Sequence, residues 1–226
     1  MLFRSRPEGR ELFIITESLF SMDGDSPSLA EVIEIGERFG AHVIVDEAHA
    51  TGCFGPHGSG LIDQLGLRPR ILASVHTGGK ALGTIGAYIC TSHLLRELLV
   101  NRCRHLIYTT ALPPALGPWW LEAIARVRSD DASRQALHAA ARLFRDALAR
   151  HGVTAEGQAY IVPLLIGADH CAMHTAHRLQ ELGYDIRAIR PPSVPPGTAR
   201  LRISIHADHT PDMLQQLAAD VARHWP

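Results

Sequence analysis

The sequence predicts an α/β protein, and the order of its apolar segments is the main reason. Residues 12–16 and 42–46 are short apolar runs typical of buried strands, and residues 28–40 between them repeat apolar side chains at helical spacing. This strand, helix, strand order predicts a parallel βαβ unit with its functional groups at the carboxyl ends of the strands. Apolar residues make up 46% of the 226 residues and charged residues 20%, which predicts a packed core.

The remaining elements follow in order along the chain. Residues 71–75 and 85–90 predict two strands joined by a glycine loop, and residues 93–100 and 115–128 predict helices. Ser129-Asp130-Asp131 predicts a break, so we expect one domain at residues 1–128 and a smaller α+β domain at residues 129–226. In the smaller domain we expect helices at residues 133–151, 171–182 and 211–224, and strands at residues 161–166, 186–189 and 200–205.

Composition and charge exclude several kinds of partner. The formal net charge is −1, from 22 basic and 23 acidic residues spread along the chain, so no positive patch for nucleic acid or an anionic membrane is expected. The four cysteines include no C-x-x-C pair, which predicts free thiols in the reducing cytoplasm. We expect no targeting segment and no membrane span. Small-molecule chemistry is therefore favoured.

Lys80 is the first candidate for chemistry, because it lies on a loop bounded by Gly78, Gly79 and Gly83 between the two central apolar runs. Glycines let a backbone turn tightly and approach a ligand closely. A lysine amine that is partly desolvated forms an imine with an aldehyde such as pyridoxal phosphate. The loop taken alone favours an ordinary surface lysine beside a hairpin.

The segment Asp46-Glu47-Ala48-His49 ends the second strand and admits two interpretations. It spells motif II of DEAH-type helicases, but those enzymes need a G-x-x-x-x-G-K-[ST] phosphate loop, which the chain lacks. The alternative is pyridoxal phosphate, whose ring nitrogen keeps its proton when an ionised Asp lies at hydrogen-bonding distance. Asp46 suits that task, His49 could contact the ring hydroxyl, and Thr77 could offer a hydroxyl to the phosphate.

Several motifs together resemble the α-oxoamine synthases, which are fold type I enzymes of pyridoxal phosphate. The resemblance covers nearly the whole chain and rests on motifs that occur in the family's order and spacing: Thr16-Glu17, residues 20–25, Asp46 to His49 with the glycines at 52, 55, 58 and 60, residues 77–83, and residues 189–202. It implies the later part of a fold type I major domain followed by a small α+β domain.

The resemblance also implies roles for individual residues. Lys80 matches the lysine that binds the cofactor's aldehyde, Asp46 the partner of the pyridine nitrogen, and His49 and Ser21 match residues near the ring oxygen. Thr77 matches a phosphate contact, and Arg202 matches the arginine that takes the amino-acid carboxylate, a task suited to a planar fork. Thr109 and Thr110 match a segment that reaches the phosphate of the neighbouring subunit, which implies a homodimer.

Residues 189–202 favour a family member that condenses L-alanine with a pimeloyl thioester and releases CO2. Two alternatives stay open: another α-oxoamine synthase that uses glycine or serine, and a non-catalytic remnant or partner of such an enzyme. Family members carry a long N-terminal segment before the strand that begins here at Leu12. If that segment is absent, we expect exposed apolar surface and little activity in this chain alone.

Two further patterns are weighed and set aside. Cys171, His174 and His177 are spaced by three, but no fourth ligand is evident and such steps drift around a helix, so we expect a solvated face and no metal. Gly55 to Gly60 does not form the G-x-G-x-x-G pattern that opens a helix after a strand, so we expect no nicotinamide site.

Overall fold

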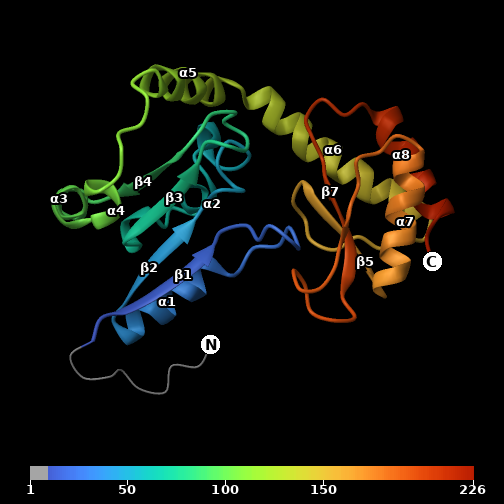
Figure 1. Ribbon diagram of the computed structural model, residues 1–226, viewed down its shortest axis with the longest axis horizontal. Coiled ribbons are helices and arrows are strands. Elements are labelled where there is room, and N and C mark those ends of the chain that lie inside the picture. The colour runs from blue at the N-terminus through green and yellow to red at the C-terminus, as the bar shows by residue number, and fades with distance from the viewer. Residues whose placement is uncertain (1–9) are drawn as a thin grey trace. The chain divides into compact units, whose positions relative to one another are not determined.

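The computed structural model of the chain describes residues 10–226, which form two compact units (Figure 1). The first unit contains the residues up to Leu19 together with Ser26–Asp131, and the second contains Phe20–Asp25 and Ala132–Pro226. The predicted domain boundary after residue 128 lies close to this division and stays a prediction. The sequence did not indicate that Phe20–Asp25 would join the second unit.

In the first unit, two three-residue 3₁₀ turns and nine other elements are described. They are β1 (Leu12–Glu17), α1 (Leu29–Phe39), β2 (Ala41–Asp46), η1 (Pro56–Gly58), α2 (Leu61–Gln64), η2 (Arg68–Arg70), β3 (Ala73–Thr77), β4 (Ala87–Thr91), α3 (His93–Arg102), α4 (Arg104–Ile107) and α5 (Leu116–Ser129). The second unit is built from α6 (Asp131–Arg150), β5 (Ile161–Gly167), α7 (Asp169–Glu181), β6 (Ala188–Ile189), β7 (Ala199–Ser204) and α8 (Pro211–Arg223).

The sheet of the first unit has the strand order β1-β2-β3-β4 and confirms the predicted α/β class. β1 pairs with β2 and β2 with β3 in parallel, with α1 as the crossover between the first two strands. β4 runs antiparallel to β3, because the short loop at residues 78–86 can only return the chain beside the strand that it left. The carboxyl ends of β1, β2 and β3 therefore meet at one edge of the sheet.

The helix α1 packs closely on this sheet because its apolar face carries a glycine. Ile33 is fully buried, and a Cβ atom at Gly36 would lie 2.7 Å from Cγ2 of Val43 in β2. The helix ends at Gly40, whose φ of 62° is the left-handed conformation that favours glycine at a helix C-terminus. The helical pattern at residues 28–40 was therefore predicted correctly, including its end.

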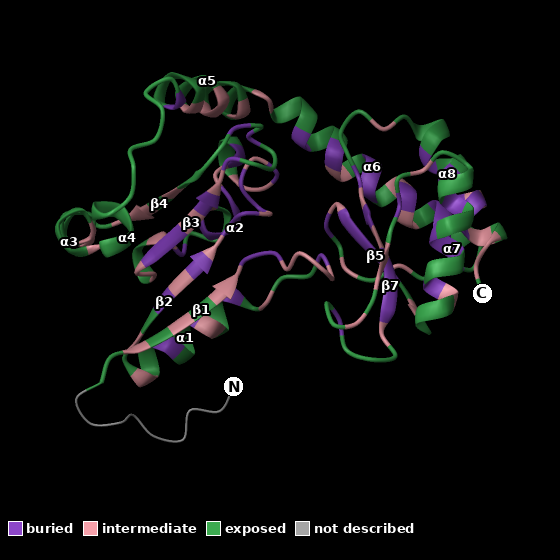
Figure 2. Cartoon of the chain, in the orientation of Figure 1, coloured by how far each residue is buried: buried purple, intermediate pink, exposed green. Residues whose placement is uncertain are grey.

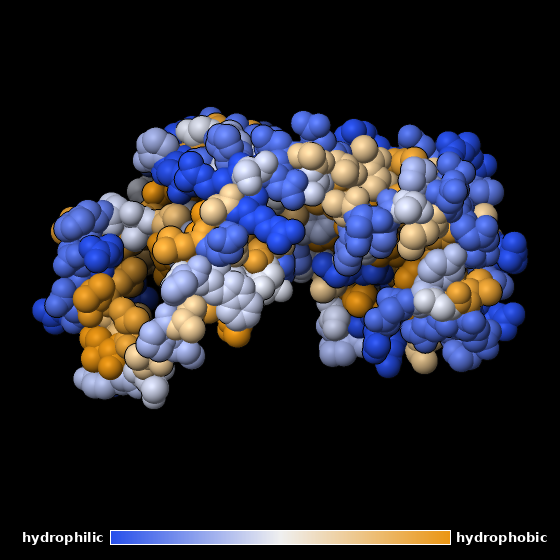
Figure 3. Space-filling view, turned by 90° about the horizontal axis from the view of Figure 1, so that it is seen from above, coloured by the Kyte–Doolittle hydropathy of each residue, from blue (hydrophilic) through white to orange (hydrophobic). Residues whose placement is uncertain are grey.

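The other face of the sheet is apolar and exposed, and we call it the open face. The register places five apolar residues of four adjacent strands on it: Phe13, Ile15, Ile44, Val75 and Ile89. Phe13 is 51% exposed, Ile15 74% and Ile89 52%, although apolar side chains in a complete sheet are normally covered. Figure 3 shows apolar side chains gathered on the surface of the first unit.

The second unit is a three-stranded antiparallel sheet of order β5-β7-β6 with helices α6, α7 and α8. Figure 2 shows that buried residues follow β5 and β7 and one side of each helix. Its core includes Phe144 and Leu148 of α6, Leu164 of β5, Leu201 of β7 and Leu214 of α8, none of them more than 2% exposed. The unit is thus an α+β arrangement with a core of its own.

Two elements of the second unit differ from the sequence-based expectation. The strand expected at residues 186–189 is reduced to Ala188–Ile189, because the carbonyl of Ile186 accepts a hydrogen bond of 2.8 Å from the side-chain amide of Gln180. The expected break at residues 129–131 is narrower than predicted, since only Asp130 separates α5 from α6. None of the helices within residues 10–226 combines the length and apolarity that a membrane crossing requires.

Candidate active site

Asp46 is the last residue of β2 and lies where the parallel strands end. Its Oδ1 accepts a hydrogen bond of 2.7 Å from the backbone N–H of Ala48, and its Oδ2 accepts none from the residues that the structure describes. Val75 of β3 is its register partner, so Asp46 faces the same side of the sheet as Thr77, two residues further along β3. His49 is partly buried in the turn that follows. These residues share the edge where α/β sheets bind ligands.

Lys80 lies on the loop that joins β3 to β4, which we call the lysine loop (residues 78–86). The loop is closed by backbone hydrogen bonds from Gly78 N to Gly86 O at 2.9 Å and from Thr84 N to Gly78 O at 2.8 Å. The Lys80 side chain is exposed and forms no ion pair with a described residue. Lys80 is also the only lysine in the sequence.

Two of the loop's three predicted glycines are required by its conformation. A Cβ atom at Gly78 would lie 2.6 Å from Thr84 and 2.7 Å from the Trp120 ring, and Gly83 has a φ of 59°. Gly79 differs, because a Cβ there would meet nothing closer than 3.9 Å. Trp120 thus packs against the backbone of the lysine loop, and its indole N–H donates to Ile85 O at 3.0 Å.

The hydroxyl of Thr77 supports an anion site at the start of this loop. Its Oγ1 is buried and has no hydrogen-bond partner among the described residues. An unpaired buried hydroxyl costs about 1–3 kcal/mol, so a bound group with oxygen acceptors would relieve that cost. Thr77, Asp46 and the lysine amine therefore fit a phosphorylated pyridine aldehyde at this edge of the sheet.

A buried polar cluster on the opposite side of the sheet from the open face was not predicted. Glu47 is fully buried and its Oε1 accepts from the N–H groups of Leu61 and Ile62 at 3.1 and 3.2 Å. A Cβ at Gly60 would lie 1.7 Å from Glu47 Oε2, so this glycine is required where the loop meets the carboxylate. Burial raises the pKa of Glu47. Ser74 and His76 belong to the same cluster, because alternate positions of β3 face the same side of the sheet.

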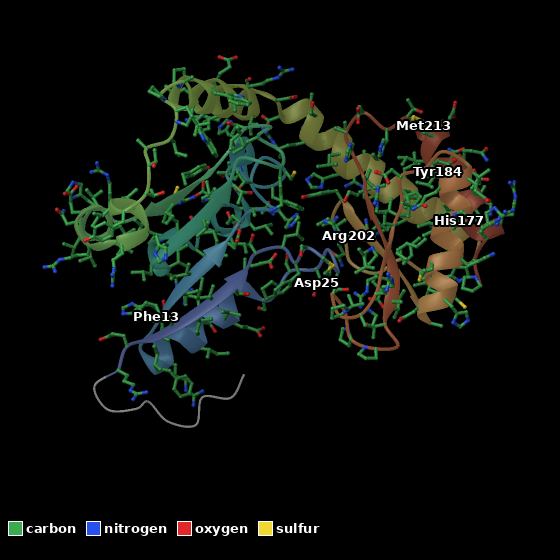
Figure 4. The ribbon with its side chains drawn as sticks, in the orientation of Figure 1. Phe13, Asp25, His177, Tyr184, Arg202 and Met213 are labelled. Carbon is green, nitrogen blue, oxygen red and sulfur yellow. The ribbon has the colours of Figure 1, made fainter. Side chains whose placement is uncertain are left out.

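The remaining predicted residues lie elsewhere. Arg202 lies on β7 of the second unit (Figure 4). Ser21 belongs to the same unit, and Arg202 Nε donates to its carbonyl. Arg200 on the same strand pairs with Asp23. Thr109 and Thr110 are exposed in the segment after α4. The structure therefore brings Asp46, Thr77 and Lys80 to one edge of the first unit, and Ser21 and Arg202 together in the second.

Possible metal ligands gather at a place that the sequence analysis did not consider. His206, Asp208 and His209 hold their ligand atoms within 4.8 Å of one another in the turn before α8. The two imidazole rings stack with centroids 5.0 Å apart, and His209 Nδ1 accepts from the backbone N–H of His206 at 3.2 Å. The hydrogen bond and the stacking account for the closeness of these side chains without a bound ion. On α7, His177 pairs with Glu181 at 3.4 Å.

The unfolding free energy of the chain is expected to depend on pH through His76. Burial, and to a lesser extent the charge of Arg68, lowers the pKa of His76 to about 4 from 6.5. Between pH 6.5 and 4 the unfolded chain binds a proton that the folded chain does not, so about 3 kcal/mol of stability is lost as the pH falls through this window. The raised pKa of Glu47 has the opposite effect, because at acid pH the folded chain binds a proton on Glu47 before the unfolded chain does, which increases the unfolding free energy.

Denaturant unfolding of the parent and of His76→Phe at pH 7, 5.5 and 4 isolates this contribution. Phenylalanine keeps an aromatic ring but has no titrating group. Between pH 7 and pH 4 the unfolding free energy of the parent should therefore fall by about 3 kcal/mol more than that of the variant. Parallel pH profiles of the two proteins would show that His76 titrates normally in the folded chain.

Comparison with known proteins identifies the family. The family model for class I and II aminotransferases matches residues 3–221. The chain belongs to that family. It is 42% identical over 210 residues to a protein of Chlorobaculum parvum named 8-amino-7-oxononanoate synthase, covering 93% of this chain and 54% of that protein. A putative synthase of the same name from Desulforudis audaxviator is 43% identical over 203 residues, covering 90% of this chain and 53% of that one.

Solved structures give the same fold. A serine palmitoyltransferase of Sphingomonas wittichii is 27% identical with a TM-score of 0.90, covering 97% of this chain and 56% of that one. The 8-amino-7-oxononanoate synthase of Francisella tularensis is 28% identical with a TM-score of 0.82, covering 96% and 63%. The chain spans just over half the length of the curated relatives and matches their C-terminal part. The later part of a fold type I domain, expected from the motifs, is confirmed.

Proposed function

We propose that this chain is the cofactor-holding part of an α-oxoamine synthase that condenses L-alanine with a pimeloyl thioester, either pimeloyl-CoA or a pimeloyl carrier protein. The products would be 8-amino-7-oxononanoate, CO2 and the free thiol, a step of biotin synthesis. The observation that carries the proposal is the identity of 40–43% to proteins named 8-amino-7-oxononanoate synthase over 90–98% of the chain. None of the four cysteines, all of which the structure describes, forms a disulfide, and this suits the cytoplasm that we propose as its location.

The cofactor is pyridoxal 5'-phosphate, as the family and its structural neighbours indicate. When bound, it supplies an electron sink for the carbon from which a proton or CO2 departs. We assign the covalent attachment to the Lys80 amine and the proton at the ring nitrogen to the ionised Asp46. The unpaired Thr77 hydroxyl is the proposed phosphate contact.

The other residues position the ring and the substrate. His49 and Ser21 are assigned to the ring oxygen, and Arg202 to the amino-acid carboxylate, which its planar fork can bind by two parallel hydrogen bonds. Thr109 and Thr110 are assigned to the phosphate of a neighbouring subunit in a homodimer. Their exposure in the segment after α4 is compatible with a contact to a second chain.

The structural neighbours keep a second amino-acid substrate open as an alternative. Serine palmitoyltransferases align with a TM-score of about 0.90, so serine or glycine is the alternative to alanine. Equal concentrations of the three amino acids, each offered with pimeloyl-CoA, separate these possibilities by the rate of thiol release.

The chain alone is expected to show little or no synthase activity, because its open face is uncovered and it spans just over half the length of its curated relatives. The part of the Chlorobaculum parvum relative that lies outside the match, fused or supplied in trans, should raise turnover by at least about 10²-fold, since positioning dominates such rates. Turnover is measured as the rate of thiol release from pimeloyl-CoA in the presence of L-alanine. A rate of about 1 per second or more from the chain alone would contradict the expectation.

A pair of variants tests whether the open face receives the added segment. Ile15→Asp places a charge on the part of that face formed by the edge strand β1 and should abolish the stimulation. Met213→Asp places the same charge on an exposed apolar residue of the second unit, 55% exposed against 74% for Ile15, and should leave the stimulation unchanged. If neither the chain alone nor the chain with the added segment shows turnover, the chain is a non-catalytic remnant.

A further inference from the structure

His76 lies at the centre of a hydrogen-bond chain whose direction is fixed by the backbone carbonyl at one end. The ring is 2% exposed, and its nitrogens contact Thr51 Oγ1 and Ser74 Oγ, each at 2.8 Å. Thr51 donates its single hydroxyl proton to the carbonyl of Glu47 at 2.8 Å. His76 Nδ1 must therefore carry the proton that Thr51 accepts, and in the neutral ring Nε2 must accept the proton of Ser74.

The chain of hydrogen bonds ends on the peptide group that orients Asp46. The carbonyl of Glu47 and the N–H of Ala48 belong to one peptide group, and that N–H donates to Asp46 Oδ1 at 2.7 Å. The same carbonyl also accepts from the N–H groups of Ala50 and Thr51 at 3.0 and 2.8 Å. The hydroxyl thus donates one of the three hydrogen bonds that this carbonyl accepts, and its loss should loosen the Asp46 carboxylate without unfolding the turn.

The face of the same ring supports the lysine loop. Tyr88 stacks on His76 with centroids 4.7 Å apart and planes 7° from parallel, and Trp120 meets Tyr88 edge-on at 5.2 Å. Trp120 in turn packs against Gly78 and donates to Ile85 O. One side chain therefore contacts, by its edge, the turn that follows Asp46 and, through two aromatic rings, the loop that carries Lys80.

We infer that His76, as the neutral Nδ1–H tautomer, is a positioning residue that holds the Asp46 carboxylate and the lysine loop in fixed relation to each other. The inference rests on the proposed function for its catalytic meaning, because that function gives Asp46 and Lys80 their roles. The order of the hydrogen bonds stands without it. The low pKa of His76 keeps the ring neutral at pH 7, as the chain of hydrogen bonds requires.

The first test needs no cofactor. Long-range ¹H–¹⁵N NMR spectra of the 226-residue chain should show one buried histidine with Nδ1 protonated and Nε2 unprotonated, unchanged between pH 8 and pH 5.5. Assignment of that signal by its loss in His76→Phe completes the measurement. An Nε2–H tautomer, or a protonated ring at pH 7, would overturn the inference.

The second test measures the peptide that the hydrogen-bond chain reaches. Hydrogen exchange of the Ala48 amide should be about tenfold faster in Thr51→Val, which removes only the hydroxyl, and in His76→Phe, in line with the loss of one hydrogen bond. His76→Asn places an amide near the position of Nδ1 and should restore the parent rate, whereas His76→Gln should not. Equal Ala48 exchange in parent and Thr51→Val would overturn the inference even if the histidine variants fail to fold.

The third test asks whether His76 acts through Asp46. Affinity for pyridoxal 5'-phosphate, measured by fluorescence titration, should fall about tenfold in Thr51→Val, but by less than about twofold when the same change is made in Asp46→Asn. Equal losses in both backgrounds would show a merely structural role and overturn the inference. If no variant, including the parent, binds the cofactor while the first two tests succeed, the proposed function fails and the positioning of Asp46 stands.

Discussion

Lys80→Ala is expected to lose the covalent attachment of pyridoxal 5'-phosphate completely and to lower turnover of the reconstituted protein by at least about 10³-fold. Lys80 is the only lysine in the sequence, so no second side-chain amine can replace it. The guanidinium groups of the arginines stay protonated and are not nucleophiles at neutral pH.

Borohydride reduction followed by mass spectrometry tests this directly. In the parent, the pyridoxyl mass should appear only on the peptide that contains Lys80, and in Lys80→Ala it should be absent. Lys80→Arg is the matched control, because it keeps the positive charge on the lysine loop but cannot form the carbon–nitrogen double bond. A labelled peptide from Lys80→Ala would remove Lys80 from its proposed role. Gly79→Ala should leave labelling unchanged. Gly78→Ala should impair labelling, because an added Cβ atom would collide with the Trp120 ring at Gly78 but not at Gly79.

Asp46→Asn is expected to slow exchange of the α-proton of L-alanine by about 10²–10³-fold in the reconstituted protein, since a neutral amide cannot hold the proton of the ring nitrogen as an ionised carboxylate does. The fold should survive, because the asparagine Oδ1 can still accept from the Ala48 N–H. Exchange in deuterated water, followed by proton NMR, isolates this step from the acyl transfer.

Glu17→Gln provides the matched control for Asp46→Asn. Glu17 is the register partner of Asp46 on β1, so its substitution removes the same charge from the same edge of the sheet. Glu17→Gln should retain most of the α-proton exchange rate if the slower exchange in Asp46→Asn comes from the lost hydrogen bond between Asp46 and the cofactor ring. Similar losses in the two variants would instead assign the effect to the general electrostatic field, and equal rates in Asp46→Asn and parent would contradict the proposed role.

The sequence alone determined the βαβ unit, the position of Asp46 and Lys80 after buried strands, and the family. These follow from local rules: apolar periodicity separates strands from helices, Gly40 ends α1, and motifs such as Asp46 to His49 are contiguous. Because the carboxyl ends of parallel strands meet at one edge, a correct strand order already brings Asp46 and Thr77 together.

Only the tertiary structure decided which residues support that edge. The supporting residues are of polar types that are seldom fully buried: Glu47, Thr51, Ser74 and His76. No local pattern predicts that Glu47 would be fully buried and would accept hydrogen bonds from the N–H groups of Leu61 and Ile62. Nor does any local pattern predict that His76 would become a buried, neutral link. Trp120 reaches Gly78 from 42 positions away in the sequence, and its contact makes that glycine necessary while Gly79 stays free to vary. Burial and hydrogen-bond partners depend on contacts between distant segments, which no local pattern specifies.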